Sequence, residues 1–101
     1  MKESKLSREA ILRELKSHLS QFERLYGVTK IGVFGSAARD ELRQDSDIDV
    51  VVQMREPDLF YLVHIKETLE KNFNRHVDII RYRDSMNRYL KARIDKEACY
   101  A

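Results

Sequence analysis

The stretch VFGSAARDELRQDSDIDVVV, residues 33–52, contains a Gly-Ser pair, a polar segment and two aspartates. The two aspartates lie at the start of a segment whose other residues are typical of a buried strand. Side chains alternate between the two faces of a strand, so Asp47 and Asp49 share one face while Ile48 and Val50 share the core face. Two carboxylates about 6–7 Å apart repel each other by about 2–3 kcal/mol at an effective dielectric of about 20. This cost indicates a function beyond packing, although a solvated strand start is the plain structural alternative.

A third carboxylate, Asp78, lies near the start of HVDII, residues 76–80, which we predict to be a strand. A helix with its turns separates this segment from residues 46–54, and that is the crossover length that parallel strands need. Parallel strands begin at the same edge of a sheet, so Asp78 would join Asp47 and Asp49 there. Three carboxylates form a site for a hard divalent cation such as Mg²⁺, and two such ions are typical of displacement at phosphorus.

The pair Gly35-Ser36 follows a predicted strand, TKIGVF at residues 29–34, and opens a predicted short helix over residues 37–42. A helix N-terminus binds phosphate well, and glycine lets the backbone come close to the ligand. The pair reaches the carboxylates only if the strand at 29–34 runs antiparallel to the strand at 46–54. Alternatively, Ser36 is only an N-cap. Arg39 stands where a capping box would have Glu or Gln, which favours anion binding, although it could instead pair with Asp40 or Asp45.

The rest of the chain predicts three longer helices. The first has apolar residues at alternating spacings of three and four and ends at Gly27. The second follows an N-cap at Asp58, and the last follows a cap at Asp84 or Ser85. The apolar positions are Leu12, Leu15, Leu19, Phe22 and Tyr26 in the first helix, Leu59, Leu62, Leu69 and Phe73 in the second, and Met86, Leu90, Ile94 and Ala98 in the last. We therefore expect an α/β (α+β) fold, with a small mixed three-stranded sheet packed with about four helices.

Length and composition narrow the class of protein. The chain has 101 residues, enough for one domain over residues 1–101 with a modest core. Its net charge of +2 does not indicate a direct nucleic-acid binder. Cys99 is the only cysteine, so no intramolecular disulfide is possible. No apolar run reaches the length of a membrane span, and the first ten residues lack the apolar core of a signal peptide, so we expect a cytoplasmic protein.

The combination of GSAAR, ten residues between Ser36 and Asp47, DID and a later VDII resembles the minimal nucleotidyltransferase (MNT) domains of the DNA polymerase beta-like superfamily. The motifs cover residues 29–80. The resemblance implies the nucleotidyltransferase fold, with Gly35 and Ser36 holding the triphosphate of ATP or another NTP and Arg39 beside them. It also implies that Asp47 and Asp49 carry two Mg²⁺ ions, while Asp78 completes the metal site and helps to deprotonate the incoming hydroxyl. Many relatives have glycine where this chain has Asp40.

The resemblance also implies a protein partner. Small proteins of this type look like the antitoxins of HEPN/MNT toxin–antitoxin pairs, and some relatives transfer AMP to a tyrosine of the HEPN ribonuclease toxin. We therefore expect a protein adenylyltransferase that forms a hetero-oligomer with its toxin. The basic side chains over residues 88–96 could face an acidic partner or form a solvated surface. Two other functions stay open: a non-catalytic module that neutralises a toxin by occlusion, and nucleotidyl transfer to a small molecule such as an aminoglycoside, which the short chain disfavours.

Overall fold

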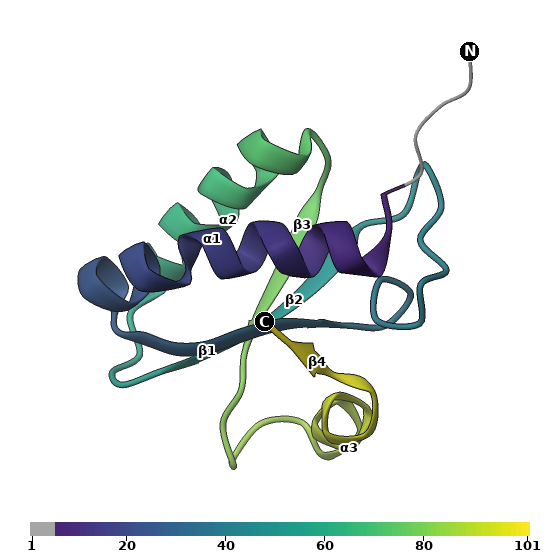
Figure 1. The fold of residues 1–101 in the computed structure, drawn as a ribbon. Helices are drawn as coiled ribbons and strands as arrows, with labels where there is room; N and C mark the ends of the chain where they lie inside the picture. The colour runs from purple at the N-terminus through teal and green to yellow at the C-terminus, as the bar shows by residue number, and fades with distance from the viewer. Residues whose placement is uncertain (1–5) are drawn as a thin grey trace.

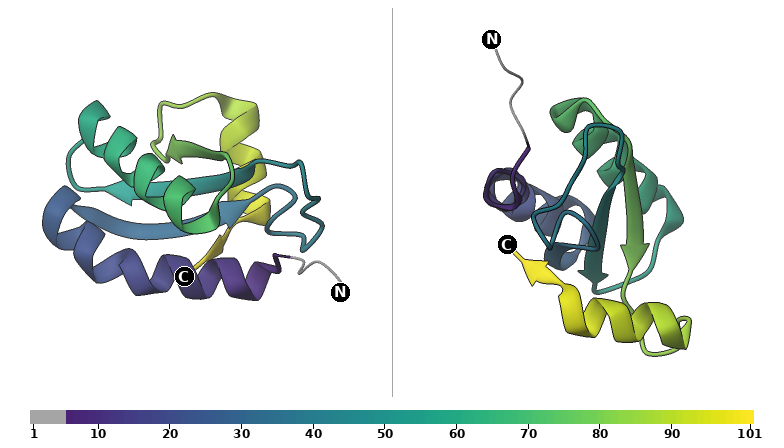
Figure 2. Two further views of the ribbon diagram at one scale, coloured as in Figure 1. Left: turned by 90° about the horizontal axis from the view of Figure 1, so that it is seen from above. Right: turned by 90° about the vertical axis from the view of Figure 1, so that its right-hand side faces the viewer.

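The computed structural model describes residues 6–101. Its elements are α1 (Arg8–Tyr26), β1 (Val28–Phe34), β2 (Ile48–Met54), α2 (Leu59–Phe73), β3 (Val77–Arg81), α3 (Arg88–Glu97) and β4 (Cys99–Tyr100). The strands form one sheet in the order β3-β2-β1-β4. Helices α1 and α2 lie on one side of this sheet, and α3 lies on the other (Figures 1 and 2). Within the described residues, no helix combines the length and the apolar character that a membrane span requires.

The strand directions agree with the sequence-based predictions. β1 pairs with β2 in antiparallel fashion, and β2 pairs with β3 in parallel. Phe34 at the end of β1 lies opposite Asp49, and Ile48 at the start of β2 lies opposite Val77 at the start of β3. The end of β1 and the starts of β2 and β3 therefore meet at one edge of the sheet, where the loop over residues 35–47 leaves it.

The end of α1 at Gly27 and the start of α2 after Asp58 agree with the predictions. Ser7 caps α1 by accepting a hydrogen bond from the Ala10 amide, and α1 ends at Gly27. The Asp58 carboxylate caps α2 by accepting hydrogen bonds from the amides of Phe60 and Tyr61. Such caps satisfy amide groups that have no partner within the helix.

The predicted cap of the last helix was wrong. Asn87, not Asp84 or Ser85, accepts hydrogen bonds from the amides of Tyr89 and Leu90, and α3 starts after it. Asn, Asp and Ser are similarly good N-caps, so the sequence offers several adjacent candidates and the local pattern does not choose among them. Met86, expected on the apolar face of this helix, precedes it and is buried against the sheet.

The sheet has a fourth strand that was not predicted. Cys99 and Tyr100 form β4, which pairs with Val33 and Gly32 of β1. The prediction of three strands, with Ala98 on the last helix, failed here because a two-residue strand carries no periodicity to recognise. A side chain at Gly32 would collide with it, since a Cβ there would lie 2.3 Å from the Cys99 carbonyl oxygen. Glycine at this position therefore allows β4 to approach β1.

The predicted short helix at residues 37–42 is a turn, so residues 6–101 contain three helices and not about four. The Arg39 amide donates to the Gly35 carbonyl oxygen at 3.1 Å, and the Asp40 amide donates to the Ala37 carbonyl oxygen at 3.2 Å. The helical pattern then stops, because Asp40 has φ +60°. An argument from a helix N-terminus at Ser36 therefore does not apply.

Two clusters of buried side chains hold the sheet between the helices. Ile48, Val50 and Val52 lie on the face covered by α1 and α2, as predicted for β2. Val51, on the same face as Asp49, is also fully buried, because α3 packs there through Ile94. Of the predicted apolar positions, Leu59 is wrong as a core residue, since 74% of it is exposed.

Candidate functional site

Two of the three predicted aspartates are direct neighbours in the sheet. Asp49 of β2 pairs with Asp78 of β3 in the parallel ladder, so both side chains project from the same face, on strands about 4.8 Å apart. Asp47 precedes β2 by one residue, and its charge acts on Asp49. The sequence predicted that three carboxylates converge; the structure places two of them, those of residues 49 and 78, side by side on one face of the sheet.

The surroundings of Asp49 disfavour its negative charge. Burial raises the pKa of the Asp49 carboxyl above its ordinary value, and the charges of Asp78 and Asp47 raise it further. The guanidinium groups of Arg93 and Arg39 act in the opposite direction and lower it. The net shift is upward. A further cation beside this carboxylate would therefore stabilise its charged form.

The turn at Gly35 lies directly against this carboxylate. Gly35 has φ +69°, and a Cβ at this position would lie 2.6 Å from Asp49 Oδ2. Both the left-handed backbone and the close approach favour glycine here. A ligand bound to the Gly35 amide would consequently lie within reach of Asp49.

The core holds the turn after Gly35 in place. Ala37 and Ala38 are almost completely buried in the cluster under α1, and Leu42 is buried with them. The Arg8 guanidinium donates to the Ala38 carbonyl oxygen at 2.9 Å. The small residues of GSAAR thus have a packing role, in addition to any role in binding.

Asp40 preserves the backbone conformation that glycine would favour at this position. Its φ of +60° is left-handed, a region that Asp tolerates better than most residues with a Cβ. Its carboxylate also accepts a hydrogen bond of 2.8 Å from the Arg8 amide in the first turn of α1. Aspartate at this position therefore ties the turn to α1.

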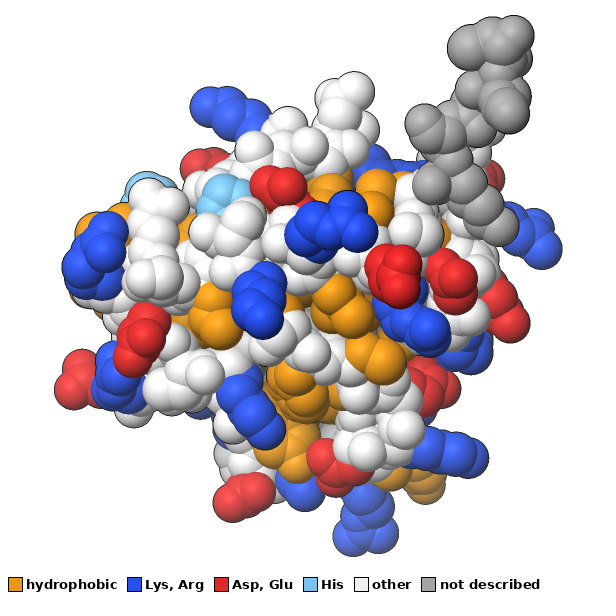
Figure 3. All heavy atoms as spheres, viewed as in Figure 1, with side chains coloured by type: hydrophobic (Ala, Val, Ile, Leu, Met, Phe, Trp, Pro, Cys, Tyr) orange, Lys and Arg blue, Asp and Glu red, His pale blue; other side chains and the backbone are white. Residues whose placement is uncertain are grey.

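Arg39 lies beside the turn but pairs with neither of the partners considered from the sequence. Its Nε contacts Glu41 Oε1 at 3.2 Å, and its Nη1 contacts Glu97 Oε1 at 3.3 Å. About half of the Arg39 side chain is exposed. Figure 3 shows acidic and basic side chains next to one another along the right-hand edge, where the loop over residues 35–47 lies.

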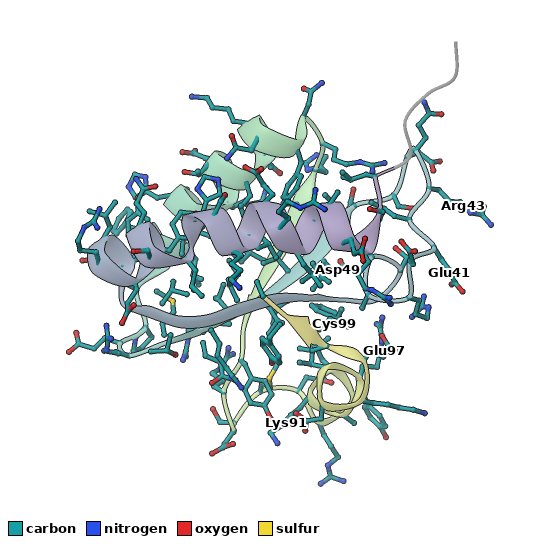
Figure 4. All side chains as sticks on the ribbon, viewed as in Figure 1. Glu41, Arg43, Asp49, Lys91, Glu97 and Cys99 are labelled. Atoms are coloured by element: carbon teal, nitrogen blue, oxygen red, sulfur yellow. The ribbon has the colours of Figure 1, made fainter. Side chains whose placement is uncertain are left out.

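Sequence reasoning did not assign two residues of α3, Arg93 and Glu97, to this site. The Gly35 amide donates to Glu97 Oε1 at 3.1 Å, and Arg93 Nη2 lies 3.5 Å from where a Gly35 Cβ would be. Figure 4 shows Glu97 and Asp49 at the same end of the molecule. The pairing of β4 with β1 brings Arg93 and Glu97 to this site, because it places the end of α3 near the end of β1. The Arg-x-x-x-Glu spacing indicates a helical pair, but nothing in the sequence indicates its location.

Glu70 positions the start of β3, and with it Asp78. Glu70 Oε2 accepts hydrogen bonds from the Val77 amide at 3.0 Å and from Lys66 Nζ at 2.8 Å, and it lies 3.1 Å from His76 Nδ1. The Lys66 ammonium and the Val77 amide lower the pKa of Glu70 to about 2. The hydrogen bond with Glu70 is the main cause that raises the pKa of Lys66, and the charges of Asp78 and Asp47 raise it further. Lys66 therefore partly balances the negative charge of the site.

The donor set fits a hard divalent cation. Within residues 6–101, no three side chains of His, Cys, Asp or Glu lie together in an arrangement that could hold a metal ion. The structure instead holds the adjacent carboxylates of Asp49 and Asp78, with Asp47 next to them. Oxygen-only carboxylate donors suit Mg²⁺, which usually keeps several waters and takes few protein ligands.

Comparisons with known proteins agree with this architecture. A model of the nucleotidyltransferase domain family matches residues 12–100. The protein adenylyltransferase MntA of Thermococcus cleftensis is 37% identical over 76 residues, which are 74% of this chain and 77% of that protein. A solved structure of a candidate minimal nucleotidyltransferase is 31% identical, with a TM-score of 0.75 over 96% of this chain and 98% of that chain.

A more distant solved structure has the same fold. It is a chain from the complex of a tri-AMPylated Shewanella oneidensis HEPN toxin with an MNT antitoxin. The TM-score is 0.68 over 92% of this chain and 70% of that chain, at 17% identity. At that identity the likeness concerns the fold alone.

Proposed function

Because the chain belongs to the nucleotidyltransferase domain family, we propose that it transfers AMP from ATP to a hydroxyl group of a partner protein, a HEPN-type toxin that it neutralises as the antitoxin. A relative that is 37% identical is named a protein adenylyltransferase, which supports AMP as the group and protein as the acceptor. The resemblance of the GSAAR, DID and VDII motifs to antitoxins of HEPN/MNT pairs supports the class of partner, and a chain with the same fold occurs in a complex of a HEPN toxin with an MNT antitoxin.

One observation carries the catalytic part of the proposal. Asp49 and Asp78 are paired across β2 and β3, beside a glycine turn that leaves no room for a side chain between it and Asp49. Burial and repulsion raise the pKa of the Asp49 carboxyl, so the negative charge of Asp49 is energetically unfavourable in the free site. Binding of a cationic complex, such as a nucleotide with its Mg²⁺ ions, relieves this repulsion. Such strained carboxylate groups are typical of functional sites.

The proposed roles are those that the resemblance to minimal nucleotidyltransferase domains implies for these residues. Gly35 and Ser36 hold the phosphates of the nucleotide, with Arg39 beside them, and Asp47, Asp49 and Asp78 hold Mg²⁺. Bound Mg²⁺ neutralises the charge that develops on the phosphate oxygens. The hydroxyl oxygen of the partner protein bonds to the α-phosphorus, and Asp78 takes up the proton that this hydroxyl loses. The bond from the α-phosphorus to the bridging oxygen breaks, and pyrophosphate leaves. Positioning and electrostatic stabilisation supply most of the rate enhancement.

The test combines the protein, the toxin encoded beside it, labelled ATP and Mg²⁺. The proposed function predicts label on the toxin with the wild type and none with Asp47→Asn or Asp49→Asn. Loss of toxin ribonuclease activity should follow the label. Glu67→Gln is a matched control, because Glu67 is exposed on α2 and lies outside the proposed site.

The alternatives give different outcomes in the same assay. Neutralisation of the toxin by both aspartate variants without any label on it would support the non-catalytic binding module. Label on an added aminoglycoside, and none on the toxin, would support transfer to a small molecule. Either outcome would overturn the proposed function.

A further inference from the structure

The Glu97 carboxylate interacts with three groups, through hydrogen bonds or ionic contacts. The Gly35 amide lies 3.1 Å from Glu97 Oε1, and Arg39 Nη1 lies 3.3 Å from the same oxygen. Arg93 Nη2 lies 3.8 Å from it. One backbone amide and two guanidinium groups therefore surround a single carboxylate oxygen, and the Glu97 side chain is only 23% exposed.

This set of donors suits a phosphate oxygen as well as a carboxylate oxygen. Guanidinium and backbone amide groups bind both anions through charge-assisted hydrogen bonds. Two of the three donors, Gly35 and Arg39, are residues that the proposed function assigns to the nucleotide phosphates. Glu97 thus occupies the position that the proposed function gives to a phosphate group.

Arg93 has the geometry of an additional phosphate ligand. Its guanidinium lies 3.5 Å from where a Gly35 Cβ would be, and 5.8 Å from the centre of the Phe34 ring. Its charge acts on Asp49 more strongly than that of Arg39 does. The Arg93 side chain is also 52% exposed, so a ligand can reach it. It therefore lies over the end of β1, beside the Gly35 turn.

The position of Glu97 in α3 does not by itself stabilise the helix. Glu97 is the last residue of α3, where the helix dipole disfavours a negative charge. Its pair with Arg93 also has the less favourable order, with the cation nearer the N-terminus of the helix. The stability of α3 therefore gives no reason for a glutamate at this position.

We propose that Arg93 binds the phosphates of the nucleotide together with Gly35 and Arg39, and that Glu97 occupies their site in the free protein until the nucleotide displaces it. This inference rests on the proposed function, because it takes the ligand to be the ATP used in that reaction. Displacement needs only a rotation of the Glu97 side chain at the end of α3. The pair Arg93 and Glu97 then sets the affinity for ATP, and leaves the chemical step unchanged.

The test measures ATP binding with Mg²⁺ by calorimetry, and the KM and kcat of AMP transfer to the toxin. Glu97→Gln is expected to bind ATP about fivefold more tightly and to lower KM with kcat unchanged, because the competing charge is gone. Arg93→Gln is expected to weaken binding about tenfold. Arg88→Gln, the same change at an exposed site on the same helix, should stay within about twofold of the wild type.

The opposite signs of the two effects exclude general destabilisation as the cause. Thermal unfolding of each variant gives an independent check of its fold. The inference is overturned if the wild type binds ATP and transfers AMP, but Glu97→Gln binds no more tightly and Arg93→Gln behaves like Arg88→Gln. In that case the proposed function stands. If the wild type binds no ATP and transfers no AMP, the proposed function fails, and the inference fails with it.

Discussion

Asp49 and Asp78 each occupy the second position of a strand, and the parallel register of β2 and β3 places them side by side. Neither residue is needed for the pairing of the strands, which uses backbone groups. The neighbouring positions in the ladder, Ile48 with Val77 and Val50 with Ile79, are apolar pairs that pack into the core. The adjacent carboxylates therefore weaken a sheet that the surrounding residues stabilise, as groups retained for function often do.

Replacing Asp49 should separate stability from activity. Asp49→Asn removes a charge that burial and Asp78 both disfavour, so the free energy of unfolding at pH 7 should equal or exceed that of the wild type. AMP transfer should fall by at least about 100-fold, since even residues that only support a metal ligand typically contribute 10- to 100-fold. Urea unfolding and the labelling assay measure the two quantities. A variant that unfolds more easily than the wild type and keeps its activity would mean that Asp49 serves the fold.

Asp40 offers a test of how the turn is held. Asp40→Gly keeps the left-handed backbone at no steric cost but loses the contact with the Arg8 amide, so its stability should change by less than about 1 kcal/mol. Asp40→Ala loses the same contact and also places a Cβ without polar groups at φ +60°, so it should cost about 1–2 kcal/mol more than Asp40→Gly. Chemical denaturation of both variants measures this order, and the reverse order would show that the backbone at residue 40 is not left-handed.

Glu70 predicts a pH dependence of stability. The Lys66 ammonium and the Val77 amide lower the pKa of Glu70 from 4.5 to about 2 in the folded protein. A lowered carboxyl pKa stabilises the folded state above pH 4.5, and this contribution is lost as the pH falls from about 4.5 to about 2. At pH 7, Glu70→Gln should therefore be less stable than the wild type by about 1 kcal/mol, because it weakens a partly exposed ion pair with Lys66. Melting temperatures of both proteins against pH should converge below about pH 2, and parallel curves across this range would contradict the prediction.

The sequence predicted the part of the fold that depends on local patterns. The alternation around Asp49, the helix-length link to residue 78 and the position of Gly35 were enough to predict both strand directions and the pairing of Asp49 with Asp78. Each of these follows from a side-chain period or a chain length, which a single sequence displays. The catalytic and metal-binding roles of these residues remain predictions.

The parts that sequence reasoning missed depend on contacts between distant segments. Strand β4 has two residues and forms because Gly32 leaves room for it, which is a property of β1 and not of residues 99–100. The contacts of Glu97 and Arg93 with the Gly35 turn depend on β4 in turn, so they were missed together. The predicted helix at 37–42 failed for the opposite reason: its composition suits a helix, but Asp40 turns left-handed to reach α1.

The closeness of β4 to Gly32 can be tested with a single methyl group. In Gly32→Ala the new Cβ would lie 2.3 Å from the Cys99 carbonyl oxygen, so β4 has to move away, at a cost of about 1–3 kcal/mol. The Ala101 amide, which donates to the Ile31 carbonyl oxygen at 2.9 Å, should then lose its protection from hydrogen exchange, whereas the Ile48 amide, which donates to His76, should keep its protection. Gly27→Ala is the control, because a Cβ at residue 27 would make only ordinary contacts with Arg55, at 3.8 Å and beyond, and costs only about 1–2 kcal/mol for its φ of +74°. That variant should be less stable while Ala101 stays protected. If Gly32→Ala also leaves Ala101 protected, β4 does not need the glycine, and another contact holds Glu97 beside Gly35.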